Sequence, residues 1–188
     1  MKAPSGPEEW KEIAKGFERW NAPNCIGSID GKHVSIQKPK HSGSEFHNYE
    51  QRESIVLLAV CDANYKFTLV DIGQAGSQSD GGTFEASEFG KAFLLGQINL
   101  PTPVCLPNDT GKPMPFVLVG DEAFPLKPNL LRPYPGKQRV CNAKRIFNYR
   151  LSRARRVIEN SFDRICRFHS SGWASVQWIL AKAIQCRA

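Results

Sequence analysis

Continuous runs of apolar residues mark the strands of this chain, because fully buried strands lack the polar alternation of half-exposed ones. Such runs, rich in valine, leucine or isoleucine, occupy residues 54–61, 67–72 and 115–119. The first two are separated by a short polar turn, so we expect them to pair as an antiparallel hairpin. A shorter run at 25–30 is followed by Gly31 and by residues 34–37, a spacing that predicts a second hairpin with Gly31 in its turn.

Apolar residues at helical spacing predict three helices. Ser5 and Glu8 have the spacing of a capping box before an amphipathic helix that ends near residue 20. A second helix is predicted over about residues 83–95, and the prolines between 125 and 135 exclude a long helix there. A third, long helix begins near residue 143, and its apolar stripe consists of Phe147, Leu151, Ala154, Ile158, Phe162 and Ile165.

This order of strands and helices predicts one mixed α/β domain, with a central mixed sheet flanked by helices. A chain of 188 residues with 41% hydrophobic and 23% charged residues is long enough to bury a substantial core. No apolar segment approaches the ~20 residues of a membrane helix, and the first residues do not have the pattern of a signal peptide. The six cysteines include no Cys-x-x-Cys pair, which argues against a zinc site and favours reduced thiols inside the cell.

The net charge of +7 is concentrated in one segment. Residues 137–167 contain ten lysines and arginines against two acidic residues, so this segment carries +8 and the rest of the chain −1. A basic patch of this kind indicates a polyanionic partner, although a solvated helix face without any partner has the same composition.

Two aspartates stand where apolar runs end, each beside a glycine. Asp30 closes the run that begins at Cys25, and Asp121 follows residues 115–119 and Gly120. Ligands of helix-flanked sheets gather at the carboxyl ends of strands, so the pair predicts a pocket of oxygen ligands. The alternative is that each aspartate only caps a turn.

Glu159, on the predicted basic helix, is the candidate for a third carboxylate. Two or three carboxylates together with a substrate phosphate suffice to hold Mg²⁺, and two such ions about 3.5–4 Å apart can serve an in-line phosphoryl displacement. The arginines around Glu159 would then meet the phosphates of DNA. Alone, Glu159 has the spacing of a surface ion pair with Arg155, so the hypothesis depends on the two aspartates.

Five segments carry a family resemblance, and they are Cys25-Ile-Gly-Ser-Ile-Asp-Gly-Lys-His-Val34, Ser54-Ile-Val-Leu-Leu-Ala-Val-Cys-Asp62, residues 71–82, Val119-Gly-Asp-Glu-Ala-Phe-Pro-Leu126 and Ala154-Arg-Arg-Val-Ile-Glu-Asn-Ser-Phe162. Together they resemble Harbinger-type (PIF/Harbinger) transposases and the domesticated nucleases derived from them, within the DDE endonuclease superfamily. The resemblance covers roughly residues 10–170. It implies a ribonuclease-H-like fold and divalent-metal-dependent DNA cleavage, with Mg²⁺ or Mn²⁺ held by Asp30, Asp121 and Glu159.

The resemblance also suggests supporting roles for other residues. Asp80 matches a Ser-Asp motif of the family and is expected to cap a helix or to support the metal ligands from behind. His33 could reach the same site, although a packed or surface histidine is the alternative. Contacts to DNA are expected from the basic helix, at Lys144, Arg145, Arg150, Arg153, Arg155 and Arg156.

At the level of the whole chain we expect a leading amphipathic helix packed on the core, residues 1–24, and a nuclease domain, residues 25–182, within a single domain. Such transposases usually carry an amino-terminal DNA-binding region, which these residues are not expected to include. The expected partners are therefore DNA and a separate DNA-targeting protein, and the expected location is the nucleus, with the cytoplasm second.

Three alternatives remain from the sequence. A DNA-binding or adaptor protein of transposon origin would keep the basic patch without cleaving DNA, and a non-functional gene fragment would expose apolar surface. An aspartate-nucleophile phosphatase would need an Asp-x-Asp motif at the first strand, and Asp30-Gly-Lys does not provide it.

Overall fold

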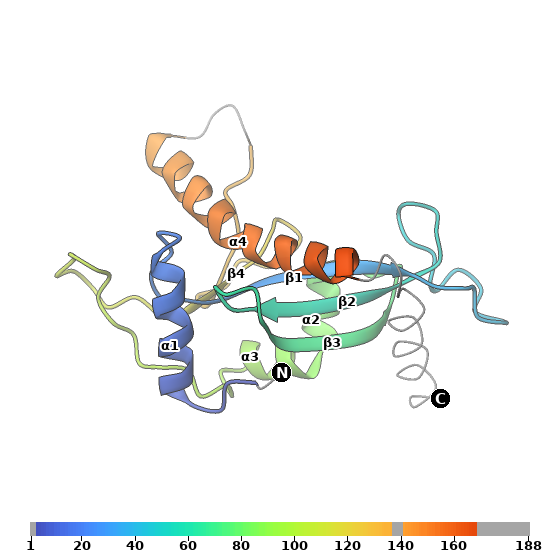
Figure 1. The fold of residues 1–188 in the computed structure, drawn as a ribbon, viewed down its shortest axis with the longest axis horizontal. Helices are drawn as coiled ribbons and strands as arrows, with labels where there is room; N and C mark the ends of the chain where they lie inside the picture. Colours follow the sequence, from blue (N-terminus) through green and yellow to red (C-terminus); the bar gives the residue numbers. More distant parts are fainter. Residues whose placement is uncertain (1–2, 137–140, 169–188) are drawn as a thin grey trace.

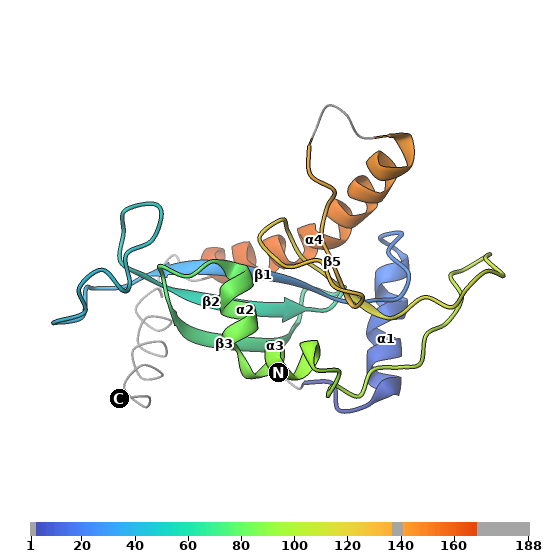
Figure 2. The ribbon, with the colours of Figure 1, turned by 180° about the vertical axis from the view of Figure 1, so that it is seen from behind.

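A five-stranded mixed sheet with helices on both faces organises residues 3–136 and 141–168, the part of the chain that the computed structural model describes (Figures 1 and 2). The strand order is β3-β2-β1-β4-β5. β1 pairs antiparallel with β2 and parallel with β4, and the outer pairs are β2–β3, antiparallel, and β4–β5, parallel. The elements in chain order are α1 (Pro7–Glu18), β1 (Cys25–Ser35), β2 (Ser54–Cys61), β3 (Phe67–Ala75), α2 (Asp80–Ala86), α3 (Glu88–Leu94), β4 (Val117–Val119), β5 (Leu130–Leu131) and α4 (Asn142–Phe168).

The predicted fold class, an α/β fold with a mixed sheet between helices, is confirmed. Apolar side chains of β1, β2 and β4 pack on one face of the sheet against α2 and α3, around Phe84 and Phe124. On the other face Leu151, Ala154 and Ile158 of α4 pack against β1 and β2. α1 contributes to both layers, because Trp10 belongs to the first cluster and Phe17 to the second.

The first strand differs from its prediction. β1 is one continuous strand of eleven residues, and Gly31 lies in its middle rather than in a turn. Gly31 pairs with Leu58 of β2, so the backbone continues through this position in extended form. The expected hairpin within residues 25–37 is therefore wrong, and Asp30 lies inside a strand instead of at its end. The hairpin of β2 and β3 is confirmed.

The helix expected over residues 83–95 is divided in two. Ser87 has an extended backbone, with ψ of 149°, and separates α2 from α3. Its buried hydroxyl accepts a hydrogen bond from the backbone N–H of Gly90 at 2.9 Å and donates one to the carbonyl of Phe84 at 2.7 Å. Serine competes with the helical backbone for such bonds, so it ends one helix and caps the next.

The start of α1 also differs in detail. Gly6 is the N-cap residue, and the carboxylate of Glu9, not Glu8, accepts hydrogen bonds from the backbone N–H and the hydroxyl of Ser5. The proline-rich segment before residue 136 contains the short strand β5, which the sequence pattern did not predict.

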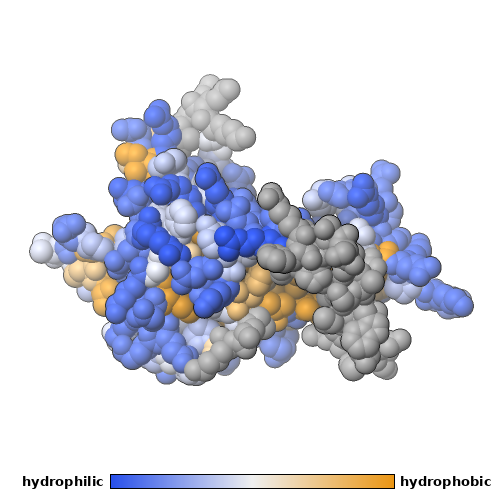
Figure 3. Space-filling view, in the orientation of Figure 1, coloured by the Kyte–Doolittle hydropathy of each residue, from blue (hydrophilic) through white to orange (hydrophobic). Residues whose placement is uncertain are grey.

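α4 confirms the long basic helix. Its apolar stripe is buried at Leu151, Ala154, Ile158 and Phe162 and half-buried at Phe147, whereas the side chain of Ile165 lies outside the described residues. The carboxyl-terminal half lies across the sheet, and the amino-terminal half rises away from it (Figure 1). On the face shown in Figure 3, most side chains on this rising half are hydrophilic, beside a small hydrophobic patch, so its charges are presented to solvent.

Candidate metal centre

Asp30 and Asp121 lie side by side because β1 and β4 are parallel neighbours. Ser28 of β1 is the partner of Val119 of β4 in the parallel register. Asp30 is two positions after Ser28, and Asp121 is two positions after Val119. Since side chains alternate along a strand, both aspartates leave the sheet on the same side. The carboxylate of Asp121 is oriented by its own turn, since one oxygen accepts a hydrogen bond from the backbone N–H of Ala123 at 2.8 Å.

Asp80 joins these two aspartates from the start of α2. Each of the three offers a carboxylate oxygen, and these oxygens all lie within 4.8 Å of one another. Asp80 does not cap its helix, because the hydroxyl of Ser79 does so by accepting from the backbone N–H of Gly82. The suggested capping role of Asp80 is therefore wrong, and its carboxylate is free to face the group.

Gly31 explains how Asp80 comes so close to β1. A Cβ built on Gly31 would overlap the carboxylate of Asp80, including its Oδ1 oxygen. Only a residue without a side chain leaves this space, so Gly31 is needed for close approach rather than for a turn.

Replacing Gly31 by alanine is therefore expected to displace the carboxylate of Asp80 and to weaken Mn²⁺ binding, with little loss of stability because the overlapping atoms are the end of a side chain that can rotate away. Calorimetry would measure the loss of affinity for Mn²⁺, and chemical denaturation would check that the stability is retained. Gly6→Ala is the control for Mn²⁺ affinity, because nothing lies within 4 Å of a Cβ at that position; it is compared by affinity and not by stability, since Gly6 is the N-cap of α1. Equal behaviour of the two variants would contradict this explanation of Gly31.

Burial and mutual repulsion keep protons on this group. The pKa of Asp30 is raised to about 7, first by burial and then by the negative charges of Asp80 and Asp121, against the opposing charge of Arg155. The pKa of Asp80 is raised by burial and by Asp121, against an opposing effect of His33. One oxygen of Asp80, Oδ1, is buried without a hydrogen-bond partner.

These observations match what a divalent cation requires. Hard cations such as Mg²⁺ and Mn²⁺ take oxygen ligands, and the three side chains offer only carboxylate oxygens. A cation would satisfy the orphaned oxygen of Asp80 and offset the negative charges that, after burial, raise the two pKa values. The residues present therefore fit a metal ion.

Glu159 lies on α4 and stands apart from this group of three. Its carboxylate forms an ion pair with the guanidinium of Arg155, at 2.9 Å, and its side chain is 49% exposed. It nevertheless lines the same polar cavity as Asp30, a cavity of about 350 Å³. α4 is fixed beside Asp30, since the hydroxyl of Ser28 donates to the backbone carbonyl of Arg155 at 3.3 Å.

The other predicted residues are distributed around this site. His33 lines the cavity and its Nδ1 lies 3.0 Å from the hydroxyl of Ser54. Among the basic residues, Arg155 is half-buried beside the carboxylates and Arg153 stacks on Trp20 and Tyr149. Four others lie along α4 and are at least partly exposed, namely Lys144, Arg145, Arg150 and Arg156.

A comparison with protein families matches residues 29–177 to the DDE superfamily endonucleases, a span that contains all four carboxylates. The chain belongs to this family. The expected resemblance to Harbinger-type members of the DDE superfamily is confirmed, and the mixed sheet agrees with the ribonuclease-H-like fold expected for them. No solved structure matches the chain significantly.

Curated relatives cover most of this DDE-family chain. "Protein ALP1-like" of Arabidopsis thaliana is 32% identical over 165 residues, which are 86% of this chain and 40% of that protein. "Putative nuclease HARBI1" of Mus musculus is 26% identical over 144 residues, 77% of this chain and 36% of that protein. The chain thus spans about two fifths of the length of these relatives.

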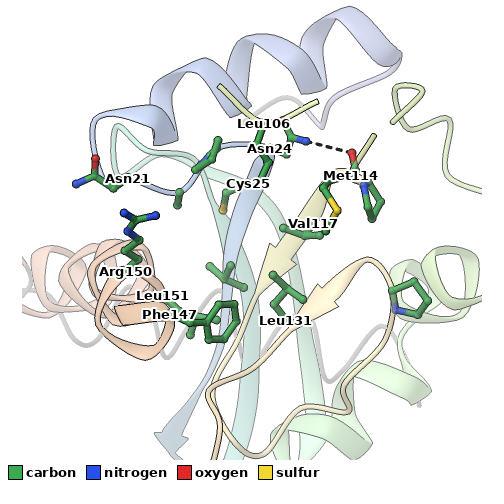
Figure 4. Close-up of a pocket in the computed structure, with 15 residues that line it drawn as sticks. Asn21, Asn24, Cys25, Leu106, Met114, Val117, Leu131, Phe147, Arg150 and Leu151 are labelled. Atoms are coloured by element: carbon green, nitrogen blue, oxygen red, sulfur yellow. Dashed lines mark hydrogen bonds between the residues drawn. The ribbon is translucent and has the colours of Figure 1, made fainter. Parts of the chain in front are cut away.

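A second cavity on this DDE-family fold lies away from the carboxylates, at the amino ends of β1 and β4. It has a volume of about 310 Å³ and is mostly apolar, with Cys25, Met114 and Val117 among the residues that line it (Figure 4). Asn24 closes one side through a hydrogen bond to the carbonyl of Met114 at 3.1 Å. Its lining contains no acidic residue, so it offers no alternative metal site.

Proposed function

We propose that the chain is a divalent-metal-dependent DNA endonuclease of transposase origin, which hydrolyses DNA phosphodiesters and could transfer the resulting strands. The observation that carries the proposal is the group of Asp30, Asp80 and Asp121, with carboxylate oxygens within 4.8 Å of one another, in a DDE-family chain. The position of the group beside the carboxyl end of β4 is the usual place for ligands in such sheets.

Asp30 and Asp121 are the central metal ligands in this proposal, and Glu159 completes the set from α4. Asp80 adds a fourth oxygen donor from the other side of β1. Mg²⁺ or Mn²⁺ bound here would supply Lewis-acid activation of water and charge stabilisation at the phosphate. Arg155 pairs with Glu159 at 2.9 Å and offers a positive charge beside the scissile phosphate.

The basic half of α4 would bind the DNA backbone. Its basic side chains Lys144, Arg145 and Arg150 lie on the part of the helix that rises from the sheet. Phosphate contacts of this kind position a duplex without reading its sequence. A separate DNA-targeting protein would supply sequence recognition, and the work would be done in the nucleus. We also retain the division into a leading helix, residues 1–24, and a nuclease domain, residues 25–182.

The test is nicking of supercoiled plasmid by the purified protein. With Mn²⁺ or Mg²⁺ we expect conversion to open-circle DNA, and with EDTA none, because the carboxylates alone cannot activate water. Activity that persists in EDTA would contradict the proposal.

A second candidate function is DNA binding without cleavage, as in an adaptor protein. The observation that favours it is the ion pair of Glu159 with Arg155, which leaves Glu159 outside the group of three aspartates. This candidate predicts plasmid binding without nicking in any metal, and binding that survives replacement of the carboxylates.

Both candidates predict that α4 contributes strongly to salt-dependent DNA binding. The triple variant Lys144→Gln, Arg145→Gln, Arg150→Gln should lower the slope of log affinity against log salt by about 0.9 for each phosphate that the helix no longer neutralises. Anisotropy titrations at several salt concentrations measure the slope. The control removes the same charge from lysines of α1 and α3, through Lys11→Gln, Lys15→Gln and Lys91→Gln, and should leave it unchanged.

A further inference from the structure

A tight turn next to the carboxylates presents an aromatic ring to solvent. Asn48 is buried and its side-chain oxygen accepts hydrogen bonds from the backbone N–H groups of Glu50 and Arg52, both at 3.0 Å. The backbone N–H of Asn48 donates to the carbonyl of Arg52 at 2.9 Å and closes the turn. Tyr49, inside this turn, is 82% exposed. The turn is thus ordered by its own hydrogen bonds, although its most apolar side chain points outward.

The ring of Tyr49 contacts one other ring. It meets His33 in a T-shaped contact, with centroids 5.4 Å apart and planes at 82°. His33 in turn lies 3.0 Å from the hydroxyl of Ser54, a fully buried residue of β2. This contact joins the ring to β1, and because Tyr49 is 82% exposed the ring still offers surface to a stacking partner.

Tyr49 shares a cavity with the candidate metal ligands. The polar cavity of about 350 Å³ is lined by Asp30 and Glu159 and also by Tyr49. Lys32 and Arg52, both exposed, line the same space and offer positive charges for phosphates. A single exposed aromatic residue is ordinary on a protein surface. This one differs in being anchored, in facing the site, and in having cations beside it.

We infer that Tyr49 is a stacking platform for an unpaired nucleobase next to the scissile phosphate, so that the preferred substrate is DNA with unpaired nucleotides at or beside the cut. This inference rests on the proposed nuclease function and names its substrate class. Every base has a flat face that stacks on an aromatic ring, and the interaction is tolerant of sequence. In an intact duplex these faces are covered by neighbouring bases, so stacking on a protein ring requires an unpaired or extruded base.

Stacking also suits the half-buried position of the carboxylates. Asp30, Asp80 and Asp121 are each only partly accessible, and Asp30 lines the polar cavity, so a phosphate that enters this cavity comes to the edge of the group. A strand freed from its complement can enter a cavity of this size more easily than a duplex can. Tyr49 would hold the base of that strand while Lys32 and Arg52 contact its backbone.

The test uses two oligonucleotides in EDTA, so that no strand is cut. One is a duplex with a short unpaired segment carrying 5-iodouracil, and the other is its fully paired counterpart. Wild-type protein should bind the first more tightly and should form a photo-crosslink from the iodouracil to Tyr49, located by mass spectrometry. Tyr49→Ala should weaken binding of the unpaired substrate about tenfold, and binding of the paired one less than about twofold.

Two variants sharpen the result. Tyr49→Phe keeps the ring and should keep both the crosslink and the preference, which separates stacking from hydrogen bonding by the hydroxyl. Leu95→Ala removes another exposed apolar side chain, at the end of α3 and outside the cavity lining, and should not change the preference. A preference for unpaired DNA that survives Tyr49→Ala, or a crosslink that maps elsewhere, would overturn the inference.

Nicking assays keep this inference distinct from the proposed function. Metal-dependent nicking without any Tyr49-dependent preference would overturn the stacking platform and leave the nuclease intact. A Tyr49-dependent crosslink without nicking in any metal would support the base-binding site and remove the nuclease.

Discussion

Asp121→Asn should reduce metal-dependent plasmid nicking by at least about 1,000-fold, which corresponds to roughly 4 kcal/mol of transition-state stabilisation. Asparagine keeps the size and one oxygen of the side chain but removes the charge that a divalent cation needs. Asp30→Asn should have an effect of the same size, because the two residues occupy equivalent places on neighbouring parallel strands. Initial rates of nicking in Mn²⁺ measure both.

The matched control is Glu85→Gln, which removes a negative charge from an exposed position of α2. Nicking by the control should equal that of the wild type. If Asp121→Asn and the control nick DNA at the same rate, the carboxylates are not the catalytic centre.

The same assay ranks the two remaining carboxylates. Asp80 lies within the group of three, whereas Glu159 must leave Arg155 to join it. Asp80→Asn should therefore lower both metal affinity and nicking. Glu159→Gln should lower nicking while leaving the binding of the first cation largely intact.

The second large effect concerns stability without metal. Between about pH 4 and 7 the unfolded chain has released the Asp30 proton, because its ordinary pKa is 3.8, whereas the folded protein retains it up to about 7. The folded state thus binds more protons over this range, so its stability falls as pH rises and levels off above about pH 7. The contribution of Asp30 to this loss is up to about 4 kcal/mol.

Asp30→Asn removes the cost of ionising this half-buried carboxyl group. In EDTA the variant should therefore be more stable than the wild type at about pH 8 and nearly equal to it at about pH 4. Urea denaturation at the two pH values measures the difference. Mn²⁺ should stabilise the wild type at the higher pH and have little effect on Asp30→Asn. If the difference in the free energy of unfolding between the wild type and Asp30→Asn is the same at both pH values, the raised pKa of Asp30 is contradicted.

Strands were predictable where burial made them uniformly apolar. The run at 54–61 has the bounds of β2, because a strand buried on both faces shows no competing pattern. The proximity of Asp30 and Asp121 was also predictable, but for a reason that was only partly correct. Asp30 lies inside β1, which continues past it. The neighbouring strand β4 is shorter and ends beside Ser28, so Asp30 lies beyond the end of β4 and not of its own strand.

The place of Asp80 could not be derived from local patterns. Its approach to Asp30 depends on the missing side chain of Gly31, and a glycine after an aspartate is equally typical of a turn. The break at Ser87 was missed for a similar reason, because the surrounding phenylalanines keep a helical spacing across it. The first case depends on a contact between distant segments and the second on local side-chain hydrogen bonds, and the spacing of apolar residues records neither.

β1 is the longest strand of the sheet and lies between β4, which pairs with Cys25–Ser28, and β2, which pairs with Ser28–Ser35, so its backbone amides around Ser28 should exchange with deuterium among the slowest in the protein. The candidate metal ligand Asp30 therefore lies on a rigid strand. The turn around Tyr49 and the rising half of α4 lie at the edge of the molecule. Conformational changes on binding are then expected in the nucleic acid and in these peripheral segments. The three carboxylates would keep their arrangement, and the DNA strand would bend to fit them.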